Sequence, residues 1–205
     1  MTKQLRIVVL GILGRTPVAG VAWQVLHYLV GLLRLGHDVY YVEDTQTWPY
    51  DRETGSDDCQ YTVNYIERLT TSYGLTDRWA YRPVSQPQVL YGLSEAKLRA
   101  LTATDVLINL TGSTELRGEY LRIPVRVYLE TDPSEPQSQI AKGDRFRLDF
   151  LNAHTHHFTF AENTGSSDCL LPPTPFEYRL TRQSVILDWW SAEIAGSAPA
   201  KHGST

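Results

Sequence analysis

The segment LRIVVLGILGRTPVAGVAWQVLHYLVGLLRLGHDVYYVED, residues 5–44, decides the fold. It opens with a short β-branched run, Leu5–Leu10, which is apolar along its length, as in strands buried on both faces. A turn with three glycines follows, and apolar residues then recur at helical spacing from Val21 to Leu35. Gly36 stands where a helix C-cap glycine belongs, and HDVYYVED predicts a second strand. The segment therefore predicts a βαβ unit.

The rest of the chain continues this alternation of strands and helices. Helical patterns cover residues 60–73, 94–101 with Ser94 as N-cap, and, as a broken stretch, 134–153. Strands are predicted in TDVLINLTG, IPVRVYLETDP, HHFTFAEN and QSVILDWW, and residues 78–91 read as an irregular excursion or small hairpin. We expect an α/β fold: a doubly wound, mostly parallel, Rossmann-like sheet in a three-layer α/β/α sandwich. Residues 1–190 form this domain, and residues 191–205 read as a linker-like or disordered tail.

The composition excludes several classes of protein. The chain has 205 residues, of which 42% are hydrophobic and 20% charged, and its net charge of −4 comes from scattered residues of both signs. A nucleic-acid partner is not expected, because clustered Lys and Arg are missing. Two distant cysteines suggest reduced thiols rather than a disulfide framework. Because neither a signal peptide nor a membrane span is recognisable, we expect a cytoplasmic protein.

The glycine turn is the first candidate binding element. Its glycines, at positions 11, 14 and 20, match neither the dinucleotide fingerprint nor the P-loop. Backbone N–H groups at the start of the following helix would still attract an anion or a sugar hydroxyl. The alternative is a βα connection without a ligand. The substrate-binding candidates from this turn are Gly14, Arg15, Thr16 and Gly20.

Ligands of doubly wound sheets bind beyond the carboxyl ends of the strands, so other strand ends join this turn. The strand TDVLINLTG adds Asn109, Thr111 and Gly112 as binding candidates. Asp132 and Glu162 follow two further strands, and a carboxylate there could act as a general base. Asp132 precedes a proline, however, and Asp-Pro is also a common way to start a turn.

Several other side chains have patterns that suit either a functional or a structural role. Glu43 and Asp44 are expected to be solvated loop acids, because the dinucleotide fingerprint is missing. His27 is expected to be buried and hydrogen-bonded. No metal is expected at the histidines of AHTHHF, because no cysteine or close acid completes a ligand set. The aromatic residues Trp48, Tyr50 and Trp79 would either stack on a flat ligand or fill irregular loops.

Residues 5–45 and the later segments IPVRVYLETDP, HHFTFAEN and TRQSVILDWW, in this order, resemble bacterial glycosyltransferases of the GT-B type, a family-1-like group with two Rossmann-like domains. The resemblance covers residues 4–190. It implies transfer of a sugar from a nucleotide-sugar donor to an acceptor hydroxyl, with no metal and no cofactor. The N-terminal domain of such an enzyme holds the acceptor and its C-terminal domain holds the donor.

By this resemblance the chain corresponds to the N-terminal half of an enzyme, truncated or split, whose donor-binding domain would be supplied in cis or in trans. In an inverting reaction Asp132, or else Glu162, would deprotonate the acceptor, an assignment that rests on their position at strand ends. Two alternatives remain: a single-domain Rossmann-like protein that binds a nucleotide or cofactor, and a non-catalytic interaction module.

Overall fold

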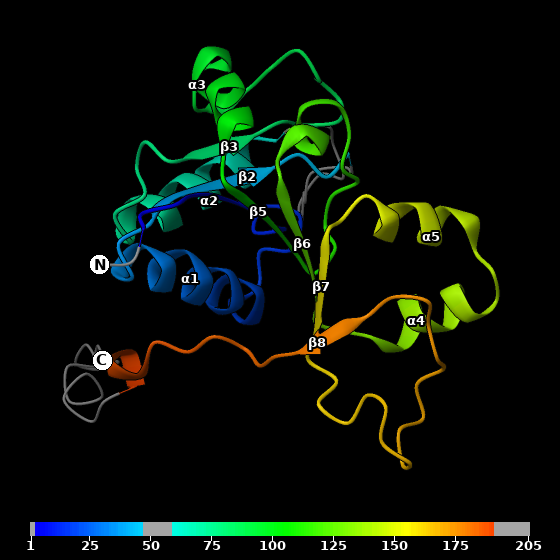
Figure 1. The fold of residues 1–205 in the computed structure, drawn as a ribbon. Helices are drawn as coiled ribbons and strands as arrows, with labels where there is room; N and C mark the ends of the chain where they lie inside the picture. Colours follow the sequence, from blue (N-terminus) through cyan, green and yellow to red (C-terminus); the bar gives the residue numbers. More distant parts are fainter. Residues whose placement is uncertain (1–2, 47–58, 191–205) are drawn as a thin grey trace, which may run out of the picture.

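The computed structural model describes residues 3–46 and 59–190. These residues form one eight-stranded sheet in the order β4-β3-β2-β1-β5-β6-β7-β8 (Figure 1). Neighbouring strands are parallel, except that β3 and β4 are antiparallel. Helices lie on both faces of the sheet, so the predicted Rossmann-like α/β fold is confirmed.

The bounds of the elements are as follows. The strands are β1 (Arg6–Leu10), β2 (Asp38–Glu43), β3 (Trp79–Tyr81), β4 (Tyr91–Gly92), β5 (Val106–Leu110), β6 (Val125–Glu130), β7 (His156–Thr159) and β8 (Tyr178–Leu180). The α-helices are α1 (Ala19–Arg34), α2 (Gln60–Ser72), α3 (Glu95–Ala100), α4 (Ser134–Ala141) and α5 (Arg145–Asn152). Short 3-10 helices are η1 (Leu101–Ala103), η2 (Gly118–Arg122) and η3 (Leu187–Trp190).

The apolar run of β1 is buried because both faces of the sheet are covered. Ile7 and Val9 belong to a core that includes residues of α1 and α2. Val8 and Leu10 point the other way, as successive residues of a strand must, into a second core with residues of α3, η1 and η2. A third cluster joins β6 to α4 and α5. Continuous hydrophobicity in β1 thus reflects a strand buried on two sides.

Helix α1 begins two residues before the predicted start, at Ala19, and ends as the sequence indicates. Gly36 has a φ of +87°. Its N–H donates to the carbonyl of Leu33 (2.9 Å), and the N–H of His37 donates to that of Leu32 (3.2 Å). This pair of bonds is a Schellman motif, in which a left-handed residue ends the helix.

The other predicted helices are also present. The hydroxyl of Ser94 accepts a hydrogen bond from the backbone N–H of Lys97 (3.3 Å), so Ser94 is the N-cap of α3. The broken helical stretch is the pair α4 and α5, separated by Gly143, whose φ is +79°. The irregular excursion contains the short antiparallel pair β3 and β4.

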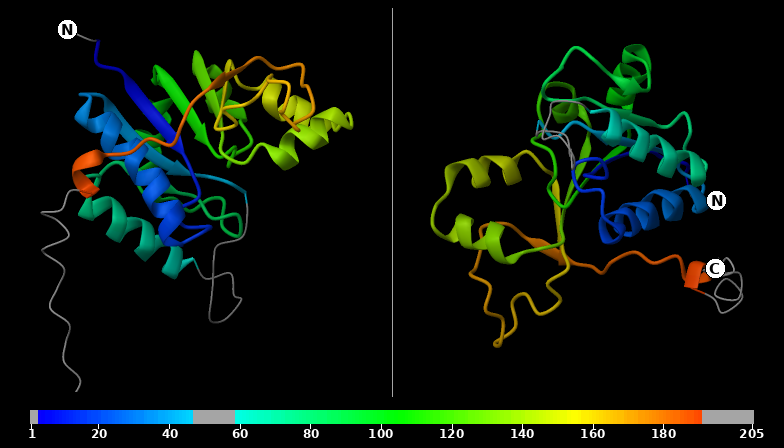
Figure 2. Two further views of the ribbon diagram at one scale, coloured as in Figure 1. Left: turned by 90° about the horizontal axis from the view of Figure 1, so that it is seen from below. Right: turned by 180° about the vertical axis from the view of Figure 1, so that it is seen from behind.

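The prediction of a strand in QSVILDWW is wrong, because Leu187–Trp190 form the 3-10 helix η3. Residues 181–190, which we call the C-terminal strap, leave β8 and run along α1 (Figures 1 and 2). Among their contacts with that helix are two hydrogen bonds: the N–H of Ile186 donates to Nδ1 of His27, and the hydroxyl of Tyr28 donates to the carbonyl of Arg182. Strand β7 also ends earlier than predicted, at Thr159.

The sheet has one topological switch point. From β1 the chain builds outward through β2 and β3 on one side, and later through β5, β6, β7 and β8 on the other. The loops after β1 and β5 therefore leave the sheet in opposite directions and open a crevice between them. No helix within the described residues is long and apolar enough to cross a membrane.

Candidate functional site

A polar pocket of about 310 Å³ lies at this switch point. We call it the switch-point pocket. It is formed by the loops that follow β1, β5 and β6, and it is lined by Ile12, Arg15, Thr16, Thr111, Gly112, Ser113, Tyr128, Glu130, Thr131, Asp132 and Pro136. Five of the residues predicted from sequence, Arg15, Thr16, Thr111, Gly112 and Asp132, therefore share one cavity.

The glycine turn is held by a buried carboxylate. Glu43, at the end of β2, accepts hydrogen bonds from the N–H of Gly14 (2.8 Å) and of Arg15 (2.7 Å), one on each carboxylate oxygen. The hydroxyl of Tyr41 donates to Glu43 (2.6 Å) and accepts from the N–H of Leu13 (2.9 Å). Two backbone amides of the glycine turn are therefore already bonded to a carboxyl group of the protein.

The expectation that Glu43 and Asp44 are solvated is thus wrong, since both are buried. Burial raises the pKa of Glu43 to about 7, although hydrogen bonds from Tyr41, Gly14 and Arg15 favour its charged form and lower the pKa. Asp44 accepts a hydrogen bond from Arg117 (2.8 Å), which ties the end of β2 to the segment before η2. The sequence feature that indicates buried, hydrogen-bonded acids here is a pair of acids at the end of a buried strand in a chain with a glycine turn.

The glycines of the turn have different surroundings. A Cβ on Gly14 would lie 2.3 Å from Cγ2 of Thr62 and 2.9 Å from Cδ1 of Ile66, both on α2. Gly14 is therefore required by close packing and lies buried behind the turn. Gly20 lies in the first turn of α1, where a Cβ would meet nothing within 4 Å. Arg15 is exposed and lines the pocket.

The loop after β5 carries unusual backbone geometry. Thr111 has a φ of +63°, a left-handed conformation that is unfavourable for a β-branched residue, and Gly112 has a φ of +62°. A Cβ on Gly112 would lie 2.6 Å from Cε2 of Tyr128, so the ring of Tyr128 also requires a glycine there. Both residues line the switch-point pocket, and such strain persists only where the surroundings impose it.

Asn109 provides that constraint from beneath the loop. Its side chain is buried, with Oδ1 accepting from the N–H of Thr114 (3.1 Å) and the hydroxyl of Ser113 (3.2 Å). Its Nδ2 donates to the carbonyl of Thr114 (2.7 Å) and lies 3.1 Å from Nε2 of His154. All its hydrogen-bonding capacity is therefore used within the protein, and Asn109 shapes the loop instead of offering its amide to the pocket.

His154 completes this network as a neutral side chain. Its Nδ1 lies 3.0 Å from the carbonyl of Phe150, which can only accept, so Nδ1 carries the proton. Its Nε2 is then the acceptor for Asn109. Burial lowers the pKa of His154 to about 4, consistent with this assignment. Within the described residues, no group of three or more His, Cys, Asp or Glu side chains could hold a metal ion.

The two predicted bases differ in their surroundings. Asp132 is exposed and lines the switch-point pocket beside Thr131. Glu162 lies outside that lining and forms two hydrogen bonds with the guanidinium of Arg182 (2.7 and 2.6 Å). This ion pair lowers the pKa of Glu162, which makes it a weaker base. The geometry favours Asp132.

Glu130 is a further acid of this site, at the strand end from which only Asp132 was predicted as a base. It is buried at the end of β6, and its carboxylate accepts hydrogen bonds from Nε2 of Gln137 (2.7 Å) and the hydroxyl of Tyr178 (3.3 Å). Burial raises its pKa. The sequence feature that indicates this role is the position of Glu130 two residues before Asp132, at the same strand end.

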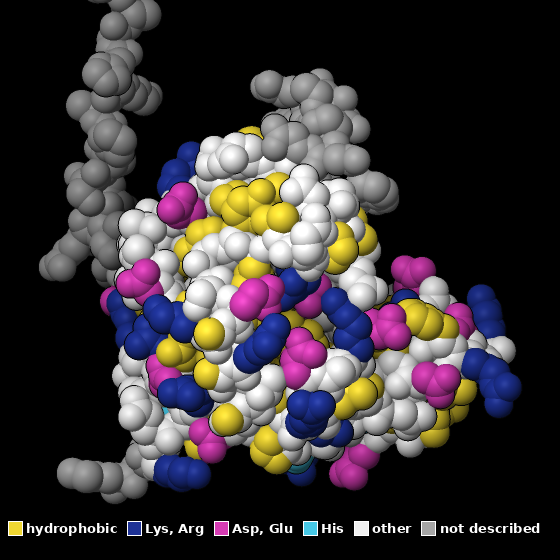
Figure 3. Space-filling view, turned by 90° about the horizontal axis from the view of Figure 1, so that it is seen from above, with side chains coloured by type: hydrophobic (Ala, Val, Ile, Leu, Met, Phe, Trp, Pro, Cys, Tyr) yellow, Lys and Arg dark blue, Asp and Glu magenta, His cyan; other side chains and the backbone are white. Residues whose placement is uncertain are grey.

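Of the aromatic candidates, only Trp79 lies within the described residues, and it does not line the switch-point pocket. Trp79 is buried in the core with α1 and α2, while Trp48 and Tyr50 lie outside the described residues. On the face shown in Figure 3, Lys and Arg side chains are interspersed with Asp and Glu side chains, so no large patch of one sign appears there. That surface is unlike the basic footprint of a nucleic-acid-binding protein.

Compared with known proteins, the chain matches no family model, no curated protein and no solved structure. The function proposed below therefore depends on the geometry of the site and on the resemblance described above.

Proposed function

We propose that the chain is the acceptor-binding domain of a glycosyltransferase and that the switch-point pocket holds the acceptor hydroxyl. The observation that carries this proposal is that Asp132 and Arg15 line one pocket of about 310 Å³ together with hydroxyl-bearing residues such as Thr16 and Thr111. Such a lining offers several hydrogen bonds to an alcohol and two carboxylates, of which Glu130 is buried and Asp132 is exposed and free to accept its proton. Asp132 is the base in this proposal.

In the proposed reaction Asp132 takes the proton of the acceptor hydroxyl as its oxygen attacks the anomeric carbon of the donor sugar. The bond from that carbon to the nucleotide phosphate breaks, and the nucleotide diphosphate leaves with the electron pair. The donor is assigned to a second α/β domain, supplied in cis or in trans. The carboxyl edge of the sheet, with Arg15 at its surface, is the side of this domain that would face the donor.

A nucleotide-binding protein is the second candidate, because nucleotides bind at switch points of such sheets. The hydrogen bonds of the glycine turn argue against the usual mode of nucleotide binding, in which backbone N–H groups of such a turn bind a phosphate. The N–H groups of Gly14 and Arg15, which would cradle a phosphate, donate to Glu43 instead. A free dinucleotide would have to displace that buried carboxylate.

Titration calorimetry of the chain with neutral sugars, aromatic alcohols, UDP-glucose and NAD tests the proposal. We expect an alcohol or sugar to bind, and we expect Asp132→Asn and Arg15→Ala each to weaken that binding about tenfold, or about 1.4 kcal/mol. Glu135→Gln, a matched change in α4 outside the pocket lining, should leave it unchanged. Tight binding of NAD that Asp132→Asn does not affect would support the second candidate instead.

A further inference from the structure

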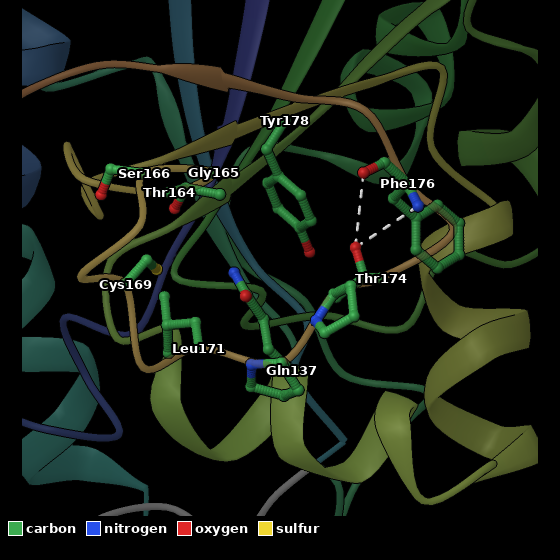
Figure 4. A pocket seen from close by; sticks show the side chains of 11 residues that line it. Gln137, Thr164, Gly165, Ser166, Cys169, Leu171, Thr174, Phe176 and Tyr178 are labelled. Atoms are coloured by element: carbon green, nitrogen blue, oxygen red, sulfur yellow. Dashed lines mark hydrogen bonds between the residues drawn. The ribbon is translucent and has the colours of Figure 1, made fainter.

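A second pocket, separate from the switch-point pocket, lies beside β8 (Figure 4). We call it the β8 pocket. Its volume is about 300 Å³, and it is lined by Gln137, Thr164, Gly165, Ser166, Cys169, Leu171, Pro172, Pro173, Thr174, Phe176 and Tyr178. Glu130 separates the two pockets, because it lines the first and accepts hydrogen bonds from Gln137 and Tyr178 of the second.

The side chain of Gln137 is the most informative feature of the β8 pocket. Gln137 is 1% exposed, and its Nε2 is fixed by the carboxylate of Glu130. This bond settles the orientation of the amide, so Oε1 is the remaining polar atom. Among the described residues none donates a hydrogen bond to Oε1, and Figure 4 shows the amide directed into the pocket, toward the ring of Tyr178. Oε1 is therefore an acceptor open to the pocket, and a ligand hydroxyl would be well placed to donate to it.

The rest of the lining restricts the chemistry of the ligand. None of the residues that line the β8 pocket carries a formal charge, so a charged ligand would find no compensating group among them. Leu171, Pro172, Pro173 and the ring of Tyr178 supply apolar surface, whereas Thr164, Ser166 and Thr174 supply hydroxyls. A lining that combines apolar surface with hydroxyl groups suits a ring with apolar faces and a hydroxylated edge.

We propose that the β8 pocket is a binding site for a neutral hydroxylated ring, of the size of a single pyranose or cyclitol. One ligand hydroxyl donates to Oε1 of Gln137, and the ring lies between Tyr178 and the segment 171–173. The site is independent of the proposed sugar transfer, because it uses none of the residues assigned to that reaction.

Cys169 provides a direct readout, because it lines the pocket, whereas Cys59 is buried in the core. The intact chain is treated with iodoacetamide, and modification of each cysteine is followed by mass spectrometry. The probes are methyl β-glucoside and myo-inositol, with glucuronate as the charged comparison. At a probe concentration of about ten times Kd, protection should slow Cys169 modification about tenfold, since only the free protein reacts. Glucuronate should not protect, and Cys59 should stay unreactive.

Two matched pairs of variants test whether the protection of Cys169 arises from binding in the β8 pocket. Leu171→Ala removes part of the pocket wall and should abolish protection, whereas Leu170→Ala, at a side chain 97% exposed, should preserve it. Gln137→Leu should also abolish protection, and Gln139→Leu on the same helix should not. Saturation-transfer NMR with the same probes gives a second measure of binding that does not depend on the thiol.

The proposal is overturned if neither neutral probe protects Cys169 and neither gives a saturation-transfer signal. It is also overturned if protection survives Leu171→Ala or if glucuronate protects as well as the neutral rings. Failure here would leave the proposed transferase function standing, because Asp132→Asn and Arg15→Ala test a different pocket. Conversely, protection that persists in Asp132→Asn would separate the two sites.

Discussion

At the scale of single residues, Glu43 holds the glycine turn in place. Its two oxygens accept the N–H groups of Gly14 and Arg15, and the hydroxyl of Tyr41 adds a third bond. In Glu43→Gln one of these N–H groups must face an NH₂ group, so a buried donor is left unpaired. We expect the free energy of unfolding to fall by about 2 kcal/mol in urea denaturation. Glu67→Gln, at an exposed position on α2, is the control.

Glu43 also predicts a pH dependence. Its pKa is about 7 in the folded protein, above its usual value of 4.5, so the folded state binds more protons between these values. Proton binding by Glu43 therefore stabilises the folded state fully below pH 4.5, and this stabilisation is lost as the pH rises to 7. The difference in unfolding free energy between the native chain and Glu43→Gln should therefore shrink when the pH increases across this range. A constant difference would contradict this prediction.

Thr111 combines strain with a place in the switch-point pocket. Its φ of +63° is costly for a β-branched residue, whereas asparagine tolerates this conformation. Thr111→Asn should therefore raise the unfolding free energy by about 0.5–1 kcal/mol. Thr131→Asn is the control, because it lines the same pocket without a positive φ. If Thr111→Asn were more stable and also bound ligand more weakly, the strain would be part of the site.

At the scale of elements, we expect glycine-to-alanine substitutions at the two ends of α1 to change the stability of the protein in opposite directions. Gly36→Ala places a Cβ on a residue with a φ of +87° and should destabilise the protein by about 1 kcal/mol. Gly20→Ala changes a helical glycine whose Cβ would meet nothing within 4 Å, so it should stabilise by up to about 1 kcal/mol. Thermal unfolding of both variants measures the contrast. An unchanged ligand affinity in Gly20→Ala would exclude a close contact between ligand and this residue.

Elements with local signals could be predicted from the sequence, and those set by distant contacts could not. The β1-α1-β2 unit, the Ser94 cap and the broken helical stretch of residues 134–153 all follow from residues within one or two turns, whereas the position of the break, at Gly143, comes from the structure. The placement of Asp132 beside Arg15 followed from the rule for strand ends. The role of Glu43 was missed because its partners lie 28 and 29 residues earlier in the chain.

The same reasoning explains the error in the C-terminal strap. QSVILDWW is rich in strand-forming residues, but its hydrogen bonds go to α1 and not to a neighbouring strand. Gln183 donates to the carbonyl of Gln24, and Ile186 donates to His27, which is 159 residues away in sequence. Trp189 also packs on the rings of Trp23 and His27, at centroid distances of 5.6 and 5.0 Å. Such contacts leave no local pattern, so propensity alone predicts a strand.

At the scale of the whole molecule, the strap connects the far edge of the sheet to its first helix. It runs from β8 along α1, so the last described residues lie beside an element from the beginning of the chain (Figure 2). His27 is the centre of this contact. Its Nδ1 accepts the N–H of Ile186 (3.1 Å), and burial lowers its pKa. Arg34 and Asp188, which pair at 2.7 Å, are the charged groups of the contact.

Because the folded pKa of His27 is lowered, its contribution to stability is present above pH 6.5 and is lost as the pH falls through the folded value. Protonation removes the acceptor for Ile186, and the strap should detach. We expect tryptophan emission to shift to the red and proteolysis within residues 181–190 to accelerate as the pH falls below 6.5. His27→Leu lacks the acceptor at every pH, so it should show both changes at neutral pH and no further transition on acidification. His156→Leu, on β7, should behave as the native chain does. An acid transition that persists in His27→Leu would assign the strap's release to another group.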